Sequence, residues 1–301
     1  MEQLKIGLEW FLNPDHVPFL VALERGWFRE AGLDVTLVEP EGHLDAFEAI
    51  ARGELDVAIT EPLHLVEDAA KGRTAVGFAR FLHTNGGVMF LKGSGIERPR
   101  DMVGKRVQYP GAPGPGGLAV VSTMIEADGG RPEGLTPVNR GFQHTDALLE
   151  GEADVATLAF RNFEVVEATH RGREAGFFAL KDWGIPDFCQ LVLFTSRDAL
   201  AERLGALQRM VAVLRRGIDA IHEEPTEARA VYFRRTETDP EDPLMSAIFA
   251  ATVPCFTFDL TLSSDYLDAL ARWMHARGLV ERRVSPEQLW RNDLVLPSRG
   301  A

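Results

Sequence analysis

The chain has 301 residues, 45% hydrophobic and 26% charged, a composition typical of a globular protein long enough for two domains of roughly 100–200 residues. Its formal net charge of −13 repels polyanions, so neither nucleic acid nor an anionic membrane surface is an expected partner. The two cysteines, Cys189 and Cys255, have no second Cys or His at the spacing of metal ligands, so the sequence predicts no metal site and no disulfide framework.

Strand-like segments alternate with helical segments over the first two thirds of the chain. This alternation predicts an α/β protein with parallel sheets covered by helices on both faces. After residue 198 the pattern becomes helical, with prolines between the helices. The expected strands are 4–9, 34–39, 55–60, 74–81, 106–109, 135–139 and 153–158, and the expected helices are 16–25, 43–52, 61–71, 117–128, 143–150, 162–171, 199–224, 226–235, 240–251 and 263–277.

An internal repeat indicates two similar lobes. Residues 45–59 and 146–158 each contain an amphipathic helix, a Gly-Glu turn and a strand that begins Asp-Val-Ala. Two copies are too few for a solenoid. We interpret the apolar runs 88–91 and 191–194 as crossings between the lobes. Lobe one would then comprise residues 1–88 and 195–301, including the C-terminal helices, and lobe two residues 89–194.

The carboxyl ends of the predicted strands locate a candidate ligand site. In open α/β sheets ligands bind beyond these ends, and in a two-lobed protein both sets face the cleft. The candidate ligand-binding residues that follow strands or precede the second crossing are Trp10, Asn13, His16, Glu39, Glu61, His64, Tyr109, Gly114, Phe160, Asn162, Trp183, Phe188 and Gln190. No catalytic residue and no metal ligand is predicted.

The corner after the first strand carries an unusual mixture of side chains. Trp10 is followed by Asn13, Asp15 and His16, polar groups that a dry core would have to satisfy, which favours a cleft position and stacking on a flat ligand. Phe11 alternates with Trp10 in an extended chain and is expected in the core. For His16, contact with a ligand and a purely local role in the turn remain equally open.

Two glutamates follow strands of lobe one. Either carboxylate can receive the exocyclic amine and ring N–H of a nitrogen heterocycle. Glu61 is favoured over Glu39 because Thr60, Pro62 and His64 surround it, whereas Glu39 lies in an acidic stretch. A solvated glutamate remains the alternative for both.

The segment 110–117 resembles a dinucleotide-binding loop in spacing but not in chemistry. Gly114, Gly116 and Ala119 fit the G-x-G-x-x-G/A pattern after a strand. The prolines of the loop remove N–H donors that a pyrophosphate would need, and no acidic residue closes the next strand. A rigid loop at a helix start is therefore the preferred interpretation, without NAD.

In lobe two, Trp183 and Phe188 either close over the ligand ring from the side opposite Trp10 or pack beneath a proline-containing loop. Cys189 is expected to be a buried small hydrophobe rather than a nucleophile.

Three stretches of the chain resemble the NMT1/THI5-like family. They are 5–40 with its tryptophan at a strand end, 106–117 with Tyr-Pro-Gly-Ala-Pro, and 182–196. The chain looks most similar to the branch of formylaminopyrimidine-binding proteins of ABC importers. This resemblance implies a bilobed periplasmic-binding-protein-like (type II) fold, a pyrimidine thiamine precursor as ligand, an ABC permease as partner, a monomer and no cofactor. Where that branch carries a glutamate, this chain has Gln190, an amide that both donates and accepts, so the preferred ligand can differ.

A second branch of the family consists of hydroxymethylpyrimidine phosphate synthases. As the resemblance implies, these enzymes bind pyridoxal phosphate on a lysine, consume one of their own histidines and carry a cysteine-rich run. In this chain His64 occupies the histidine position, but Thr60 stands at the lysine position and only Cys189 remains of the cysteine run. Without an amine at residue 60 no Schiff base can form there.

Three hypotheses follow: a solute-binding protein for a small heteroaromatic, a cytoplasmic enzyme on the same scaffold, and a ligand sensor. No run of 18 apolar residues occurs, and the chain enters a strand at once. The expected location is periplasmic or membrane-tethered if an export signal was removed, and cytoplasmic if Met1 is the native start.

Overall fold

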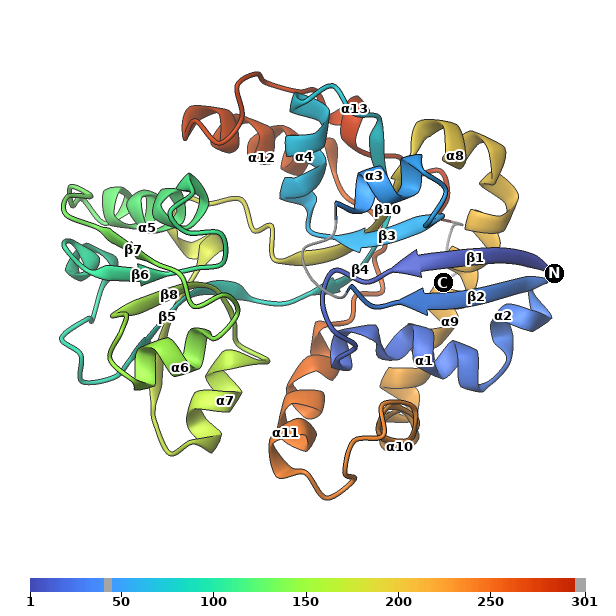
Figure 1. Ribbon diagram of the computed structural model, residues 1–301, viewed down its shortest axis with the longest axis horizontal. Coiled ribbons are helices and arrows are strands. Elements are labelled where there is room, and N and C mark those ends of the chain that lie inside the picture. Colours follow the sequence, from blue (N-terminus) through green and yellow to red (C-terminus); the bar gives the residue numbers. More distant parts are fainter. Residues whose placement is uncertain (41–44, 296–301) are drawn as a thin grey trace.

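The computed structural model describes residues 1–40 and 45–295, and the predicted helix start at 43–44 lies outside them. Two α/β lobes lie side by side, each built on a five-stranded sheet (Figure 1). The strands of lobe one are ordered β2-β1-β3-β10-β4 and those of lobe two β7-β6-β8-β5-β9. Their bounds are β1 Glu2–Gly7, β2 Leu33–Val38, β3 Val57–Thr60, β4 Ala75–His83, β5 Gly86–Leu91, β6 Arg106–Gln108, β7 Thr136–Val138, β8 Val155–Phe160, β9 Ala175–Ala179 and β10 Gln190–Ser196.

The helices follow the sequence prediction closely, with additional short turns. Their bounds are α1 Val17–Glu24, α2 Trp27–Glu30, α3 Ala46–Ala51, α4 Pro62–Ala70, α5 Pro115–Ala127, α6 His144–Leu149, α7 Glu164–His170, α8 Arg197–Glu202, α9 Leu204–Glu223, α10 Pro225–Arg235, α11 Pro243–Thr252, α12 Ser264–Ala276 and α13 Pro286–Leu289, with 3₁₀ turns η1 Pro14–His16, η2 Pro99–Met102, η3 Leu180–Trp183 and η4 Val253–Cys255.

Each sheet is mixed rather than wholly parallel. In lobe one β1 pairs in parallel with β2 and β3, whereas β10 runs antiparallel to β3 and β4. In lobe two β6 pairs in parallel with β7 and β8, whereas β5 runs antiparallel to β8 and β9. Each antiparallel strand is the one that the chain forms directly after it has crossed from the other lobe.

The apolar runs interpreted as crossings therefore lie within sheet strands. Residues 88–91 belong to β5 in lobe two, and 191–194 belong to β10 in lobe one. The chain passes between the lobes at Thr84 and Asn85 and again between β9 and β10. These passages shift the division between the lobes by a few residues from the predicted boundaries at 89 and 194.

The two passages pack against each other. The Thr84 hydroxyl donates to the Cys189 carbonyl at 3.1 Å. A Cβ at Gly86 would lie 1.9 Å from the Cys189 sulfur, so the glycine is required for this close approach. Cys189 is fully buried, as expected for a small hydrophobe. The lobes are thus joined by two adjacent segments that form one hinge.

The repeat recognised in the sequence performs the same task in both lobes. Asp56, which precedes β3, accepts a hydrogen bond from the Lys5 backbone N–H at 2.7 Å. Asp154, which precedes β8, accepts one from the Arg106 N–H at 2.8 Å. In both cases the carboxylate ties the start of the strand to the neighbouring parallel strand, which is why Asp-Val-Ala recurs.

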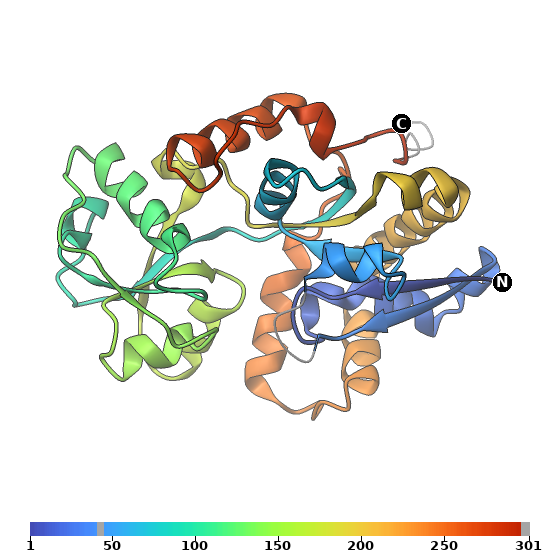
Figure 2. The ribbon, with the colours of Figure 1, turned by 45° about the horizontal axis from the view of Figure 1, so that its top comes forward.

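The C-terminal helices cover lobe one and also reach lobe two. In Figure 2 α12 extends over α4 toward the other lobe. The Trp273 indole N–H of α12 donates to the Thr123 hydroxyl of α5 at 3.2 Å, and Arg277 pairs with Glu126 at 2.7 Å. These helices therefore support lobe one, as expected, and bridge to the other lobe as well.

Helix α9 packs on α1 through a glycine, which allows a test of this packing. A Cβ at Gly217 would lie 2.5 Å from the Pro18 carbonyl oxygen, whereas one at Gly205 in the same helix would meet only the end of Arg209 at 3.5 Å. We expect Gly217→Ala to lower the free energy of unfolding by about 1–3 kcal/mol, because the helices must separate. Gly205→Ala should raise it by up to about 1 kcal/mol through helix propensity. Urea unfolding of both variants tests this, and equal effects would contradict the proposed contact.

Candidate functional site

The corner after β1 is fixed by its own polar side chains. The Asn13 side chain accepts a hydrogen bond from the Asp15 N–H at 2.8 Å and donates to the Phe11 carbonyl at 3.0 Å. The buried His16 accepts from the Asn13 N–H through Nδ1 at 3.2 Å and faces the Glu9 carboxylate through Nε2 at 3.1 Å. Burial alone would lower the pKa of His16, but the adjacent Glu9 carboxylate outweighs it and raises the pKa. Asn13 and His16 thus build the corner.

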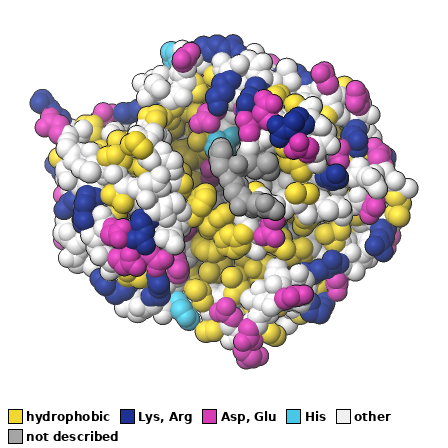
Figure 3. Space-filling view, in the orientation of Figure 1, with side chains coloured by type: hydrophobic (Ala, Val, Ile, Leu, Met, Phe, Trp, Pro, Cys, Tyr) yellow, Lys and Arg dark blue, Asp and Glu magenta, His cyan; other side chains and the backbone are white. Residues whose placement is uncertain are grey.

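Aromatic side chains from both lobes meet at Trp10. Its ring centroid lies 4.4 Å from that of Phe11, 5.2 Å from that of Phe142 and 5.5 Å from that of Phe163. Phe142 follows β7 and Phe163 follows β8, so both belong to lobe two. Figure 3 shows hydrophobic side chains along the groove between the lobes. A flat ring that enters this groove can contact aromatic faces from both lobes.

The expectation that Phe11 lies in the core is wrong, because its side chain is 38% exposed. The strand ends at Gly7 and the chain then turns, so the alternation of an extended strand no longer applies.

Trp183 and Phe188 do not meet Trp10 in this structure. Trp183 packs edge-on against Phe178 at 6.1 Å, and Phe188, which is 1% exposed, lies 5.9 Å from Trp273. Sequence reasoning missed Phe142 and Phe163, although each follows a strand of lobe two and the rule applied to Trp10 selects such positions.

Three carboxyl groups near the strand ends of the two lobes have raised pKa values. Burial raises the pKa of Asp15 to about 7 and that of Glu61 to about 8, and Glu9 adds to both shifts. Burial likewise raises the pKa of Glu164 to about 8, and Asp15 contributes from the other lobe. An apolar surrounding and neighbouring carboxylates both disfavour ionisation. Glu61 and Glu164 are therefore mostly protonated at neutral pH, and Asp15 is about half protonated.

Asn162 links the two lobes beside these carboxyl groups. Its side-chain NH₂ donates to the Thr252 hydroxyl at 2.9 Å and approaches Asp15 Oδ1 at 3.5 Å. Its Oδ1 is buried and has no hydrogen-bond partner within the described residues. Phe160, by contrast, contributes its backbone N–H, which donates to Glu164 at 2.8 Å.

Other predicted residues have local partners. Glu39 is exposed and accepts from the Leu12 N–H at 2.6 Å. The Thr60 hydroxyl lies 2.9 Å from His64 Nδ1, and the His64 side chain is otherwise exposed. Thr60 is thus hydrogen-bonded at the position where a synthase would need its lysine.

Tyr109 and Gly114 stiffen the proline-containing loop. The buried Tyr109 hydroxyl donates to the Gly114 carbonyl. A Cβ at Gly117 would lie 2.2 Å from the Tyr109 ring, so only glycine fits at the first turn of α5. These contacts hold the loop against the start of α5, and its contact with a ligand stays a prediction.

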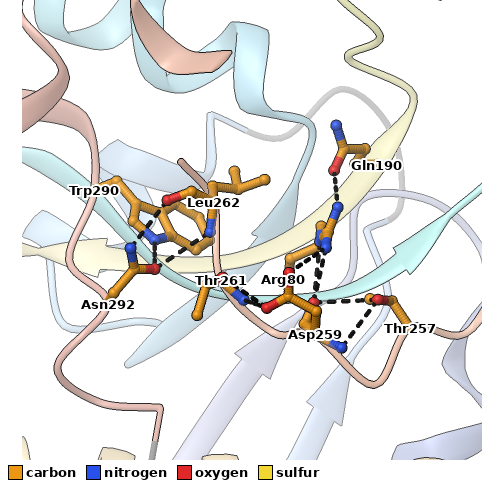
Figure 4. A network of polar contacts seen from close by, with 8 residues as sticks. All are labelled: Arg80, Gln190, Thr257, Asp259, Thr261, Leu262, Trp290 and Asn292. Atoms are coloured by element: carbon orange, nitrogen blue, oxygen red, sulfur yellow. Dashed lines mark hydrogen bonds and ion pairs between the residues drawn. The ribbon is translucent and has the colours of Figure 1, made fainter. Parts of the chain in front are cut away.

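Gln190 lies at the hinge, two strands away from β1 (Figure 4). Its Oε1 accepts from Arg80 at 3.1 Å and its NH₂ donates to the Asp187 carbonyl at 2.6 Å. Arg80, His83, Asp187, Gln190 and Tyr266 are among the residues that line a polar hollow of about 370 Å³ there. Both ends of the amide have partners in the protein.

Within residues 1–40 and 45–295 no cluster of His, Cys, Asp or Glu has the arrangement of a metal site. In the same part of the chain, no helix combines the length and apolarity that a membrane crossing needs.

The raised pKa of Glu164 predicts a pH effect on stability. A carboxyl group whose pKa rises from 4.5 to about 8 on folding stabilises the folded state below pH 4.5, and this stabilisation is lost as the pH rises through about 8. We expect Glu164→Gln to match the native protein near pH 5 and to be more stable by about 1–3 kcal/mol near pH 9, because no buried charge then forms. Urea unfolding at both pH values measures the effect, with the exposed Glu174→Gln of lobe two as control. A difference that is independent of pH would contradict it.

Comparisons with known proteins bear on the fold and the family. The model of the family described as NMT1/THI5 like matches residues 13–228. A formylaminopyrimidine-binding protein of Halalkalibacterium halodurans is 29% identical over 76% of this chain and 69% of its own length. A 4-amino-5-hydroxymethyl-2-methylpyrimidine phosphate synthase of Legionella pneumophila is 27% identical over 96% of this chain and 90% of its own length.

Solved structures support the fold assignment. The periplasmic aliphatic sulphonate binding protein of Escherichia coli superposes with a TM-score of 0.76 at 13% identity, covering 100% of this chain and 96% of that protein. The alkanesulfonate-binding protein of Xanthomonas axonopodis pv. citri gives a TM-score of 0.73 at 16% identity, with 97% and 99% covered. The chain therefore belongs to the NMT1/THI5-like family and has the bilobed α/β fold of periplasmic binding proteins.

Proposed function

We propose that this protein is a solute-binding protein that captures a small heteroaromatic, a pyrimidine related to thiamine precursors, and delivers it to an ABC permease. The observation that carries the proposal is the meeting of Trp10 in lobe one with Phe142 and Phe163 in lobe two, and Phe163 directly precedes the buried Glu164. Aromatic faces on both lobes suit a flat ring, and the carboxyl groups suit its nitrogen edge. The resemblance to a formylaminopyrimidine-binding protein supports the choice of a pyrimidine.

Glu61 has the chemistry to recognise an aminopyrimidine. It follows β3 directly and its pKa is raised by burial, then by Glu9 and Asp187. A protonated carboxyl group offers one donor and one acceptor, and an aminopyrimidine edge offers an acceptor nitrogen next to a donor amine. The pair is therefore complementary: the carboxyl O–H can donate to the ring nitrogen while its carbonyl oxygen accepts from the amine.

Delivery to a permease implies that the lobes open and close about the hinge. The short passages at Thr84 to Asn85 and between β9 and β10 connect lobes that otherwise touch through side chains. A ligand that contacts both lobes favours the closed state over the open one. In this proposal the protein acts outside the cytoplasm, in the periplasm or tethered to the membrane.

Isothermal titration with 4-amino-2-methylpyrimidine tests the proposal. We expect the native protein to bind it, and Trp10→Ala to weaken binding by about 1–3 kcal/mol, the contribution of a buried aromatic contact. Phe258→Ala is the matched control, since this ring is 56% exposed and stacks on His222, on α9. Failure of the native protein to bind this pyrimidine, or equal losses in the two variants, would refute the proposed site.

The synthase alternative rests on relatives named for that activity, one of which matches 96% of this chain. The residues present do not fit its cofactor. Thr60 offers a hydroxyl that is already hydrogen-bonded to His64, and Cys189 is buried with a pKa raised well above its usual value by burial. A Schiff base needs an amine. We therefore propose that the protein is not an enzyme of this type.

Pyridoxal phosphate provides a direct test of this alternative. After incubation with the cofactor, gel filtration and absorbance spectroscopy, the native protein should retain none, because residue 60 has no amine. Thr60→Lys should retain some, while Thr60→Ser, which keeps the hydroxyl, should not. Cofactor retained by the native protein after borohydride treatment would show that another lysine holds it and would restore the enzyme hypothesis.

A further inference from the structure

Among the described residues Asp15, Glu61 and Glu164 have no Arg or Lys partner, and the neighbouring His16 offsets the effect of burial on the pKa of Asp15 only in part. Glu9 pairs with His16 at 3.1 Å. Among the ion pairs of residues 1–40 and 45–295, none joins an Arg or Lys to Asp15, Glu61 or Glu164. Elsewhere acidic side chains form ion pairs with basic ones; Asp128, for example, pairs with Arg98 and Arg100. A buried carboxyl group without a counter-charge stays neutral by holding its proton, and it ionises at low cost when a positively charged group from outside the chain pairs with it.

Asn162 provides a second and independent sign. It is 4% exposed, and its Oδ1 has no donor within the described residues although it lies beside Asp15. In the present orientation its NH₂ is directed toward the Thr252 hydroxyl and Asp15, which leaves Oδ1 as the acceptor without a donor. A buried acceptor left without a donor costs about 1–3 kcal/mol. An N–H group of a ligand would remove this cost.

The aromatic residues are interleaved with these polar groups. Phe163 stands between Asn162 and Glu164 in the chain, and Trp10 follows Glu9. The centroids of Trp10 and Phe163 are 5.5 Å apart. Aromatic faces attract cations as well as flat rings, and the attraction grows where water is excluded.

We propose that the cleft binds its heteroaromatic ligand as a cation, with Asp15 and Glu164 facing the positively charged N–H edge and Asn162 Oδ1 accepting one of its hydrogens. The inference rests on the proposed function and specifies the charge of the ligand. The class is a flat amidinium or protonated aminopyrimidine. Glu61 then keeps its donor and acceptor for the remaining nitrogen edge. The raised pKa values of Asp15 and Glu164 agree with this, because a carboxyl group holds its proton until a cation replaces it.

Benzamidine and benzamide are the probes, since they have the same flat ring and nearly the same shape and differ in charge. We expect isothermal titration at neutral pH to give a dissociation constant at least about tenfold lower for benzamidine, the gain from one charge-assisted hydrogen bond. Asp15→Asn, which keeps the size of the side chain, should remove most of this preference and leave benzamide within about twofold of its native value.

Two variants and one reference ligand complete the design. Glu164→Gln should also reduce the preference and serves if Asp15→Asn fails to fold, and Glu167→Gln, partly exposed on the same helix, should leave it unchanged. The reference is 4-amino-2-methylpyrimidine. If the protein binds it but prefers benzamide, binds neither probe, or keeps its preference in both variants, the cationic assignment is overturned and the proposed function stands. If none of the three compounds binds, the proposed function itself has failed.

Discussion

The structure depends on the two places where the chain crosses from one lobe to the other. Each sheet is completed by an antiparallel strand, β5 or β10, that the chain forms immediately after crossing. The crossings touch where Gly86 leaves room for Cys189. The backbone hydrogen bonds of each sheet extend up to the hinge. When one lobe moves relative to the other, β5 therefore moves with lobe two and β10 with lobe one. This constraint brings the carboxyl ends of β1 and β3 opposite those of β6 and β8.

At these strand ends the polar residues perform two different tasks. Asn13 and His16 satisfy one another and the backbone, and Tyr109 does the same for its loop. Asp15 and Glu164 have raised pKa values, and the Asn162 side-chain oxygen has no donor in the part of the chain that the structure describes. The first group holds the backbone at the strand ends in place. The second group has polar atoms that are left to interact with a ligand. A chain selected for stability alone would satisfy or replace the second group, so its persistence agrees with a binding role.

The fold was predictable because its signals are local. Helix and strand periods, and the repeated Asp-Val-Ala that ties β3 to β1 and β8 to β6, are readable within a few residues. The position of Trp10 also followed from one strand end. Its partners did not, because Phe188 packs on Trp273, 85 residues later, and Phe142 meets Trp10 only through the approach of the two lobes. Which side chains face each other across the two lobes depends on tertiary packing. The hydrophobic periodicity of the sequence does not encode it.

The bridges between the lobes also bear on how quickly a solute exchanges. On one flank Asn162 reaches Thr252, and on the other α12 holds α5 through Trp273 and through the pair of Arg277 with Glu126. A solute that enters from solvent must first part these contacts. The rate at which the solute dissociates then depends on how fast the lobes separate as well as on the solute's own contacts. The Arg277 pair is partly exposed, so ionic strength weakens it and shortens the residence time of whatever the cleft holds.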